Sequence, residues 1–352
     1  DCFARHCEAD EVNRSNLKNG LATGCAISRT GLLPPRSARG RNDESCILTL
    51  LKAFDYSRED LKFIIKPMVE NAQEPVGSMG NDTPHAVLSN RPQLLYTYFK
   101  QLFAQVTNPA IDPIREELVM SLETYLGPEK NILEETPAHC HKLLVKQPIL
   151  SNEELENIRN IKKNNFKTKQ ISLLFKVSQK NSFQKALDKI CQEAEMAISA
   201  KGGSASGGKD GFTSIILSDR GVNPVRNTKG LKRKNKISNG VNKDYAALPS
   251  LLAVAAVHHY LIRKALRTQI SIILESAEPR EVHHFALLFG YGADCINPYL
   301  AYEAVNYMLK EEGLNMDLET ALYHYTKAVN KGILKILSKM GISTLQSYRG
   351  AQ

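Results

Sequence analysis

Residues 203–209 have the glycine and lysine spacing of a phosphate-binding loop, G-x-x-x-x-G-K. Such a loop continues with Ser or Thr, whose hydroxyl binds the metal ion, but Asp210 stands there in this sequence. The segment also follows a predicted helix and precedes a predicted strand, so no helix N-terminus would face a bound phosphate. The pattern therefore favours a flexible linker over a nucleotide site.

Other patterns could indicate metal or nucleophilic chemistry. Residues 139–141 read His-Cys-His, but adjacent side chains cannot easily converge on one ion, and no second ligand pair has the spacing of a zinc site. Cys2 cannot act as an N-terminal nucleophile, because that chemistry needs the α-amine of the cysteine itself and Asp1 precedes it. The histidine pairs at 258–259 and 283–284 lie in predicted helices, where one member of each pair would face the core or an interface. We therefore predict no metal site and no catalytic residue from these patterns.

Three carboxylates, Asp219, Glu275 and Asp294, lie next to predicted strands. The carboxyl ends of parallel strands form the usual ligand pocket of an α/β sheet, and carboxylates there can act as general acids or bases. These residues are the catalytic candidates if the chain is a stand-alone α/β enzyme or a small-molecule-binding domain. None of them shares a motif with a nucleophile, so this hypothesis is the alternative one.

A glycine-rich segment at residues 75–84 has the features of a ligand-facing loop. Gly77 and Gly80 flank Ser78 and Met79, and glycine lets a backbone approach a ligand closely. The following Asp-Thr pair can satisfy turn amides. From the residues alone, a structural turn and a binding loop both remain open, and the turn is favoured.

The composition is typical of a globular protein, with 352 residues, 42% hydrophobic and 24% charged. This length allows two domains or one large α/β unit. No apolar run approaches the roughly 20 residues that a membrane span needs. The seven cysteines include no C-x-x-C pair, which favours a reducing cytoplasm.

The net charge of +9 is concentrated in one short segment. Residues 226–236 hold six basic residues and no acid, and without them the net charge would be +9 − 6 = +3. Gly-Val-Asn at 221–223 recurs at 240–242, so we interpret residues 224–242 as an inserted basic loop on the surface. The run has no interleaved aromatic residues, and we predict no nucleic-acid partner. A basic binding module acting through residues 226–236 is a third hypothesis.

Hydrophobic periodicity predicts a helical N-terminal part followed by alternating strands and helices. Residues 1–44 show no sustained period and are predicted to be poorly ordered or foreign to the rest. Pro67 and Pro75 are expected to break the chain. The alternation predicts an α/β fold with a mostly parallel sheet flanked by helices. Helices are expected at 46–54, 93–106, 114–126, 181–200, 249–266, 279–289, 301–311 and 318–340, and strands at 171–177, 213–217, 270–274 and 295–296.

Several of these segments together resemble the central domain of the glutamate synthase large chain. The resemblance extends over roughly residues 48–352, so residues 45–338 are assigned to that domain. Residues 339–352 resemble the start of the family's FMN-binding barrel, so the chain is interpreted as a fragment. The matching segments are residues 74–84, 103–116, 217–222, 280–284, 290–294 and 297–299.

The resemblance implies a role between two reaction centres. In this family a glutaminase domain releases ammonia, and a flavin domain with FMN and an iron–sulfur cluster converts 2-oxoglutarate and ammonia into glutamate. The central domain connects the two and helps wall the ammonia tunnel, so this fragment alone is expected to bind no cofactor and to catalyse nothing. The resemblance further implies that Gly77, Ser78, Met79 and Gly80 face the flavin and 2-oxoglutarate site, with Met79 as the contact. It does not distinguish NADPH from ferredoxin as electron donor.

Overall fold

The computed structural model describes residues 41–75, 85–100, 111, 114–161, 166–199, 211–220, 240–312, 314 and 316–350. Residues 1–40, the glycine-rich loop with Gly77, Ser78, Met79 and Gly80, the phosphate-loop-like segment at 203–209 and the basic run at 226–236 lie outside the described residues. Among the helices of the described part, none is both long and apolar enough to cross a membrane.

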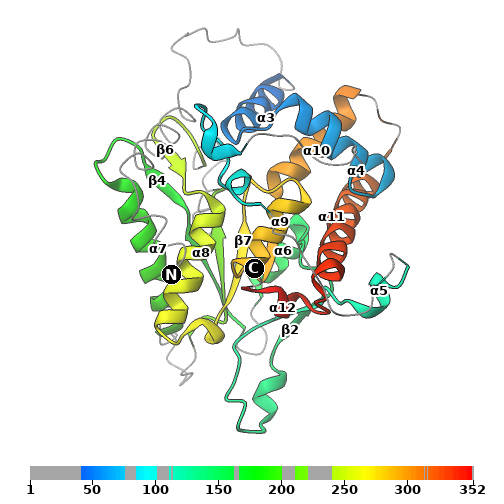
Figure 1. Cartoon of the computed structure of the whole chain (residues 1–352). Helices are drawn as coiled ribbons and strands as arrows, with labels where there is room; N and C mark the ends of the chain where they lie inside the picture. The colour runs from blue at the N-terminus through cyan, green and yellow to red at the C-terminus, as the bar shows by residue number, and fades with distance from the viewer. Residues whose placement is uncertain are drawn as a thin grey trace, which may run out of the picture.

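A four-stranded parallel sheet forms the centre of the molecule, which confirms the predicted α/β class (Figure 1). Both β5 and β7 are buried along their whole length, as expected for parallel strands covered on both faces. The order β3-β5-β7-β8 follows the order of the strands along the chain. The strands are β3 (Thr168–Ser172), β5 (Ser214–Ser218), β7 (Ser271–Glu275) and β8 (Cys295–Asn297).

The side chains of the strands contribute to two hydrophobic cores, one on each face of the sheet, because successive residues of a strand point to opposite faces. Ile215 and Leu217 of β5 belong to the larger core, whereas Ile216 between them belongs to the smaller one. Ile272, Ile273 and Leu274 of β7 alternate in the same register. The apolar runs of the sequence are therefore continuous because both faces need apolar side chains.

Long helices cover the sheet face that carries the larger core. On this face α7 and α8 pack together at one end, and α9 to α11 lie at the other end (Figure 1). α11 begins where Asp317 Oδ2 accepts a hydrogen bond from Thr320 N at 2.9 Å, and it ends at Gly341, whose φ is 68°. All five helices were predicted within a few residues. They are α7 (Ser182–Ser199), α8 (Ser250–Arg263), α9 (Val282–Gly290), α10 (Tyr299–Glu312) and α11 (Leu318–Met340).

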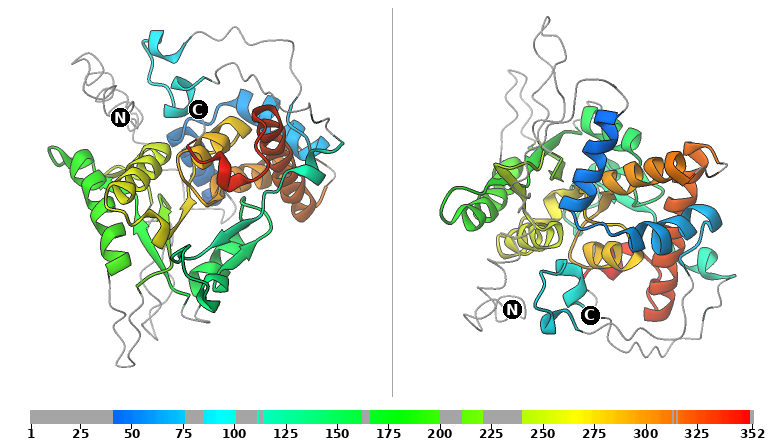
Figure 2. Two further views of the ribbon diagram at one scale, coloured as in Figure 1. Left: turned by 60° about the horizontal axis from the view of Figure 1, so that its bottom comes forward. Right: turned by 90° about the horizontal axis from the view of Figure 1, so that it is seen from above.

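The opposite face carries the smaller core and an antiparallel ribbon that projects from the body (Figure 2, left). α6 (Asn152–Asn160) contributes Leu155 and Ile158 to this core, and the ribbon contributes Leu126. The remaining short elements are β1 (Thr124–Leu126), η4 (Pro137–Cys140), β2 (Leu143–Val145), β4 (Leu174–Lys176), β6 (Tyr245–Ala247), η5 (Arg267–Gln269) and α12 (Leu345–Tyr348).

The described N-terminal part is helical, as predicted, but Pro67 does not break it. α3 (Arg41–Ala53) is followed by the π-helical turn η1 (Asp60–Ile65), which continues directly into α4 (Lys66–Asn71). Proline lacks the N–H that an α-helix would use, and the wider π turn before it accommodates that loss.

Two predicted helices are wrong in the described residues. The segment predicted as 93–106 contains the short 3-10 helix η3 (Leu95–Tyr98) and is extended at Phe99. The segment predicted as 114–126 contains one helical turn, α5 (Glu116–Val119), and then β1. Tertiary contacts override the periodicity: the fully buried Tyr96 is held by Ser250, whereas Tyr98 is 47% exposed. The other short helix of this region is η2 (Ala86–Leu88).

The ends of the undescribed segment 221–239 lie next to each other. A Cβ atom placed on Gly240 would lie 3.4 Å from the Arg220 carbonyl oxygen. A surface insertion requires such adjacent ends, so this geometry is compatible with the predicted inserted loop.

The contact between α9 and α11 depends on Gly332. A Cβ at this position would lie 2.4 Å from Val282 Cγ2. Gly332→Ala is expected to lower the free energy of unfolding by up to about 2 kcal/mol, because an overpacking cost of about 1–3 kcal/mol outweighs the gain of roughly 1 kcal/mol in helix propensity. Urea denaturation of the purified chain measures this. The double variant Gly332→Ala/Val282→Ala should lose less than the sum of the single variants, and additive losses would contradict the steric explanation.

Candidate functional site at the carboxyl edge of the sheet

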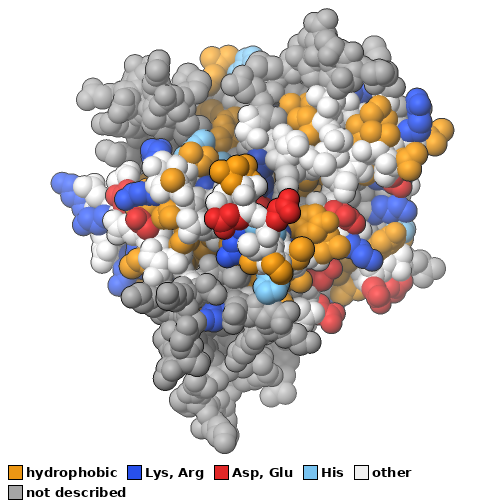
Figure 3. Space-filling view, turned by 90° about the horizontal axis from the view of Figure 1, so that it is seen from below, with side chains coloured by type: hydrophobic (Ala, Val, Ile, Leu, Met, Phe, Trp, Pro, Cys, Tyr) orange, Lys and Arg blue, Asp and Glu red, His pale blue; other side chains and the backbone are white. Residues whose placement is uncertain are grey.

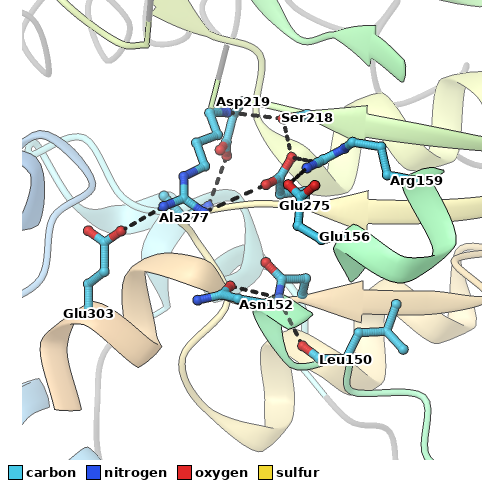
Figure 4. A network of polar contacts seen from close by, with 11 residues as sticks. Leu150, Asn152, Glu156, Arg159, Ser218, Asp219, Glu275, Ala277 and Glu303 are labelled. Carbon is cyan, nitrogen blue, oxygen red and sulfur yellow. Dashed lines mark hydrogen bonds and ion pairs between the residues drawn. The ribbon is translucent and has the colours of Figure 1, made fainter. Parts of the chain in front are cut away.

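Polar residues converge where the parallel strands end (Figure 4). Asp219 follows β5, Glu275 ends β7 and Asn297 ends β8. Parallel register brings these ends to one edge, and the Asp219 N–H donates to the Glu275 carbonyl at 3.2 Å. This edge is therefore the candidate functional site.

Asp219 is almost fully buried, with 1% of its surface exposed. Its Oδ2 accepts hydrogen bonds from Ser276 Oγ at 2.7 Å and from Ala277 N at 3.0 Å. Burial raises the pKa of this carboxyl to about 7, because the charged form is poorly solvated, and these two hydrogen bonds oppose the rise. Asp219 is therefore a proton-binding group near neutral pH.

Glu275 is also buried, but arginines compensate its charge. Oε2 accepts hydrogen bonds from Ser218 Oγ at 2.7 Å and from Arg159 Nη2 at 2.8 Å. Arg220 Nη1 lies 3.8 Å from Oε1. The residue thereby connects β5, β7 and α6, and a buried ion pair of this kind costs stability when one partner is removed.

Arg220 marks the outer rim of the site. Its guanidinium lies 4.8 Å from the centre of the Tyr299 ring and donates a hydrogen bond to Glu303 Oε1 at 3.1 Å. Burial raises the pKa of the Tyr299 phenol and of the Glu303 carboxyl, and the arginine opposes both shifts. Arg220 thus joins the polar edge to α10.

Asn297 closes the site on the side of α6. Its amide donates to the Leu150 carbonyl at 2.9 Å and to Asn152 Oδ1 at 3.1 Å. The Tyr302 hydroxyl donates to the same Leu150 carbonyl at 3.1 Å. The start of α6 is therefore fixed to the end of β8.

A second polar group surrounds the loop after β7. Glu278 Oε2 accepts hydrogen bonds from Ser250 Oγ at 2.6 Å and from Ser250 N at 2.9 Å. The Tyr96 hydroxyl lies 2.5 Å from Ser250 Oγ, and burial raises the pKa of both Tyr96 and Glu278. This group binds the segment around Tyr96 to the start of α8.

Arg280 joins the N-terminal helices to the same loop. Its guanidinium donates to the carbonyls of Phe54 at 3.1 Å and Asp55 at 2.7 Å, and it pairs with Asp60 at 3.0 Å. It also lies 4.4 Å from the centre of the Tyr56 ring. One buried cation thus fixes the turn between α3 and the π-helical turn.

This arrangement is suited to holding elements together rather than to binding a ligand. Because the strand order follows the chain, the described sheet has no point where the order reverses, which is where α/β sheets usually open a ligand crevice. A cavity of about 90 Å³ lies instead at the amino edge, beside Asp294, and flavin-sized ligands occupy several hundred Å³.

The described residues do not fit the cofactors that the resemblance implies for the neighbouring domain. In this part of the chain no group of three or more His, Cys, Asp or Glu could hold a metal ion. Cys191 and Cys295 are buried, and burial raises the pKa of the Cys191 thiol to about 11, whereas a cluster ligand is a thiolate. We derive no chemical step through FMN or an iron–sulfur cluster in this chain.

The structure brings together two of the three carboxylate candidates. Asp219 and Glu275 share the carboxyl edge, but Asp294 precedes β8 and lies at the amino edge, so grouping it with them was wrong. Its Oδ2 accepts hydrogen bonds from Ile272 N at 2.6 Å and from Arg267 at 3.1 Å. The sequence shows which residues flank a strand, but a side chain before a strand points to the opposite edge from one after it.

The histidine patterns have structural roles in the described residues. His284 is buried and stacks on Tyr96 at 4.3 Å between ring centres, while His283 is partly exposed. His139 binds the backbone of Asn131 and Thr136 within an exposed turn. The glycine-rich loop with Gly77, Ser78, Met79 and Gly80 lies outside the described residues, so its role stays a prediction.

Other residues of the site were missed by sequence analysis. They share no local motif, because each of the contacts Arg159–Glu275, Tyr96–Ser250 and Arg280–Phe54 joins positions more than 100 residues apart in sequence. Only the buried polar residues in otherwise apolar strand ends could have indicated that partners were required.

Fold and site together define an α/β domain whose parallel sheet is closed at its carboxyl edge by a buried polar network. A family model described as the glutamate synthase central domain matches residues 49–352. The chain belongs to this family.

Three curated relatives show the extent of the similarity. The NADPH-type glutamate synthase large chain of Bacillus subtilis is 43% identical over 319 residues, which cover 91% of this chain and 19% of the relative. The NADH-type enzyme of Schizosaccharomyces pombe is 42% identical, with coverages of 85% and 13%. Ferredoxin-dependent glutamate synthase 2 of Synechocystis is 40% identical, with coverages of 88% and 19%. The chain therefore spans less than a fifth of each of these relatives.

The raised pKa of Asp219 predicts a pH-dependent stability. The folded protein disfavours the charged carboxylate of Asp219. The contribution of the protonated carboxyl to the free energy of unfolding is therefore fully present below pH about 4 and is lost as the pH rises to about 7. Asp219→Asn should therefore gain stability relative to the original chain across this range, up to roughly 4 kcal/mol at about 1.4 kcal/mol per pKa unit.

Urea denaturation of both proteins between pH 4 and pH 8 measures this difference. Ser276→Ala removes a hydrogen bond that favours the charged form, so the loss of stability should still begin near pH 4 but should extend to higher pH than in the original chain. Parallel stability curves for the original chain and Asp219→Asn would contradict the prediction.

Proposed function

We propose that this chain is the connector of a glutamate synthase, lying between a glutaminase domain and a flavin domain. In this role it holds the two reaction centres at a fixed separation and forms part of the wall along which ammonia passes. The family match over residues 49–352, in a chain that spans only 13–19% of three such enzymes, carries the proposal.

The closed carboxyl edge supports a connecting role. Two buried charges described there pair with a charge on another element: Glu275 with Arg159 of α6, and Arg280 with Asp60. Such contacts resist relative movement of the N-terminal helices, α6 and the sheet. A domain that keeps two distant sites in register needs this rigidity, because small displacements of a reacting group can cost large factors in rate.

The cofactors and partners belong to the parent enzyme in this proposal. FMN and an iron–sulfur cluster lie in the neighbouring flavin domain, and the chain itself binds neither. The relatives include NADPH-, NADH- and ferredoxin-type enzymes at 38–43% identity, so the central domain does not identify the electron donor. We place the enzyme in the cytoplasm, where free thiols such as Cys140, Cys191 and Cys295 persist.

The stand-alone enzyme hypothesis is less well supported. It requires Asp219, Glu275 and Asp294 to line one pocket, but they lie at two opposite edges of the sheet. Glu275 is also occupied by two arginines and a serine.

Arg280 provides a test of the connector function in the complete polypeptide. Arg280→Lys keeps the charge but cannot reproduce the forked contacts to the Phe54 and Asp55 carbonyls. Glutamate formation driven by glutamine should fall on the order of tenfold relative to formation driven by added ammonia, since only the former needs both centres in register.

The matched control is Arg263→Lys on the exposed surface of α8, which should leave the ratio of the two rates unchanged. An equal fall in both rates for Arg280→Lys would indicate a general loss of folding. An unchanged ratio in a fully folded protein would contradict the connector function.

Met79 provides a separate test of the glycine-rich loop. If this loop contacts the flavin and 2-oxoglutarate site, Met79→Ala should raise the KM for 2-oxoglutarate and alter the visible spectrum of the bound flavin. The glutaminase rate should stay the same, because that site is distant in the proposed arrangement. Unchanged kinetics and spectrum would show that Met79 makes no such contact.

A further inference from the structure

An arm formed by residues 124–145 projects from the amino edge of the sheet. It consists of β1, a connecting turn with η4, and β2, and it extends from the lower end of the molecule (Figure 1). Four large apolar side chains of this arm are exposed: Tyr125 at 45%, Leu144 at 46%, Ile132 at 91% and Leu133 at 88%. Such a concentration on one projecting element indicates a surface that meets another polypeptide.

The strands of the arm present two of these side chains together. Tyr125 and Leu144 are opposite each other in the antiparallel register, so their side chains lie on the same face. The flanking residue Leu126 is fully buried in the smaller core. One face of the ribbon therefore holds the arm to the body, and the other presents a tyrosine and a leucine outward.

The turn of the arm is held by hydrogen bonds although its apolar residues face water. Asn131 Oδ1 accepts from Leu133 N at 3.1 Å, and Asn131 Nδ2 donates to Glu134 Oε1 at 3.0 Å. His139 Nε2 lies 3.0 Å from the Asn131 carbonyl oxygen. The turn thus has a defined shape that presents Ile132 and Leu133, which differs from a loose loop in which apolar residues happen to be exposed.

The base of the arm is joined to the last described residues of the chain. Ser121 N donates to the Ser343 carbonyl at 2.8 Å, and Leu345 N donates to the Ser121 carbonyl at 3.3 Å. Tyr125 also lines the small amino-edge cavity together with Gln346 and Arg349. Figure 3 shows this end of the molecule, where apolar side chains lie among acidic and histidine side chains.

Arg349 and Gly350 fix the position of the last described residues. It pairs with the buried Asp294, which also pairs with Arg267 at 3.1 Å, and Gly350 N donates to the Gly290 carbonyl at 2.9 Å. The last described residues thus lie at the amino edge, beside the base of the arm.

We propose that the arm is a docking surface for the part of the polypeptide that follows residue 352, with Tyr125, Ile132, Leu133 and Leu144 in the contact. The relatives are at least five times longer than the matched region, and the last described residues lie next to this surface. The inference rests on the proposed connector function, and it specifies which face of the domain receives the following domain.

Thiol labelling of the complete polypeptide tests the docking. Leu133→Cys is introduced in a Cys140→Ser background, Met196→Cys on α7 serves as the control, and modification by a maleimide is followed peptide by peptide. In the described structure Leu133 is 88% exposed and Met196 is 54% exposed. If the arm is docked, Leu133→Cys should nevertheless react at least tenfold more slowly than Met196→Cys.

Equal or faster reaction at Leu133→Cys would overturn the proposal, and Ile132→Cys is a second probe if the first variant does not fold. Slow reaction that disappears on dilution would identify a second copy of the chain as the occupant and would also overturn it. Glutamine-driven activity of the same polypeptide reports separately on the connector function. An active enzyme with an unprotected arm would contradict only the docking proposal. An inactive enzyme with a protected arm would contradict only the proposed connector function.

Discussion

Buried charge at the carboxyl ends of β5 and β7 is the constraint on which the rest of the structure depends. Asp219 and Glu275 follow strands that are apolar on both faces, so neither carboxylate can reach water without disrupting the sheet. Each must find donors on other elements, because an unpaired buried charge is strongly destabilising. The serine and backbone donors at 276–277 and the arginines at 159 and 220 meet this requirement, and they thereby determine where α6 and the loop after β7 lie.

The loop after β7 is the point where the described elements meet. Ser276 and Ala277 of this loop donate hydrogen bonds to Asp219. Glu278 binds the start of α8, and Arg280 binds the end of α3. The Tyr56 hydroxyl donates to the Ala277 carbonyl at 2.8 Å, and the Tyr325 hydroxyl of α11 donates to the Arg280 carbonyl at 3.0 Å. A single loop therefore fixes four separate parts of the chain, which explains how a sheet of short strands can support a rigid domain.

The two edges of the sheet have different tasks. At the carboxyl edge, polar side chains bind to one another and to backbone groups and join the surrounding helices to the sheet (Figure 4). At the amino edge, Asp294 and two arginines hold the described segment that follows α12, and the arm beside them leaves large apolar side chains exposed. The proposed connector function requires both properties, because a connector must be stiff in itself and must also present surfaces to its neighbours.

The sequence by itself determined the α/β class, the long helices α7 to α11 and the strands β5, β7 and β8, because apolar periodicity there reflects local geometry and continuous burial. Its specific segments carried the family resemblance, which the family model confirms. The single strand predicted at 171–177 is instead divided between the end of β3 and β4, which pair in different sheets. The sequence also indicated Asp219 and Glu275 as residues of one edge, since a residue after a parallel strand has a defined direction. Only the tertiary structure decided that Asp294 pairs with Arg267 and Arg349, that Pro67 continues a helix through a π turn, and that Tyr96 is buried within a short 3-10 helix. These outcomes depend on partners such as Ser250, Arg267 and Arg349, which lie far away in the sequence, and local propensity carries no information about which distant group will satisfy a buried polar atom.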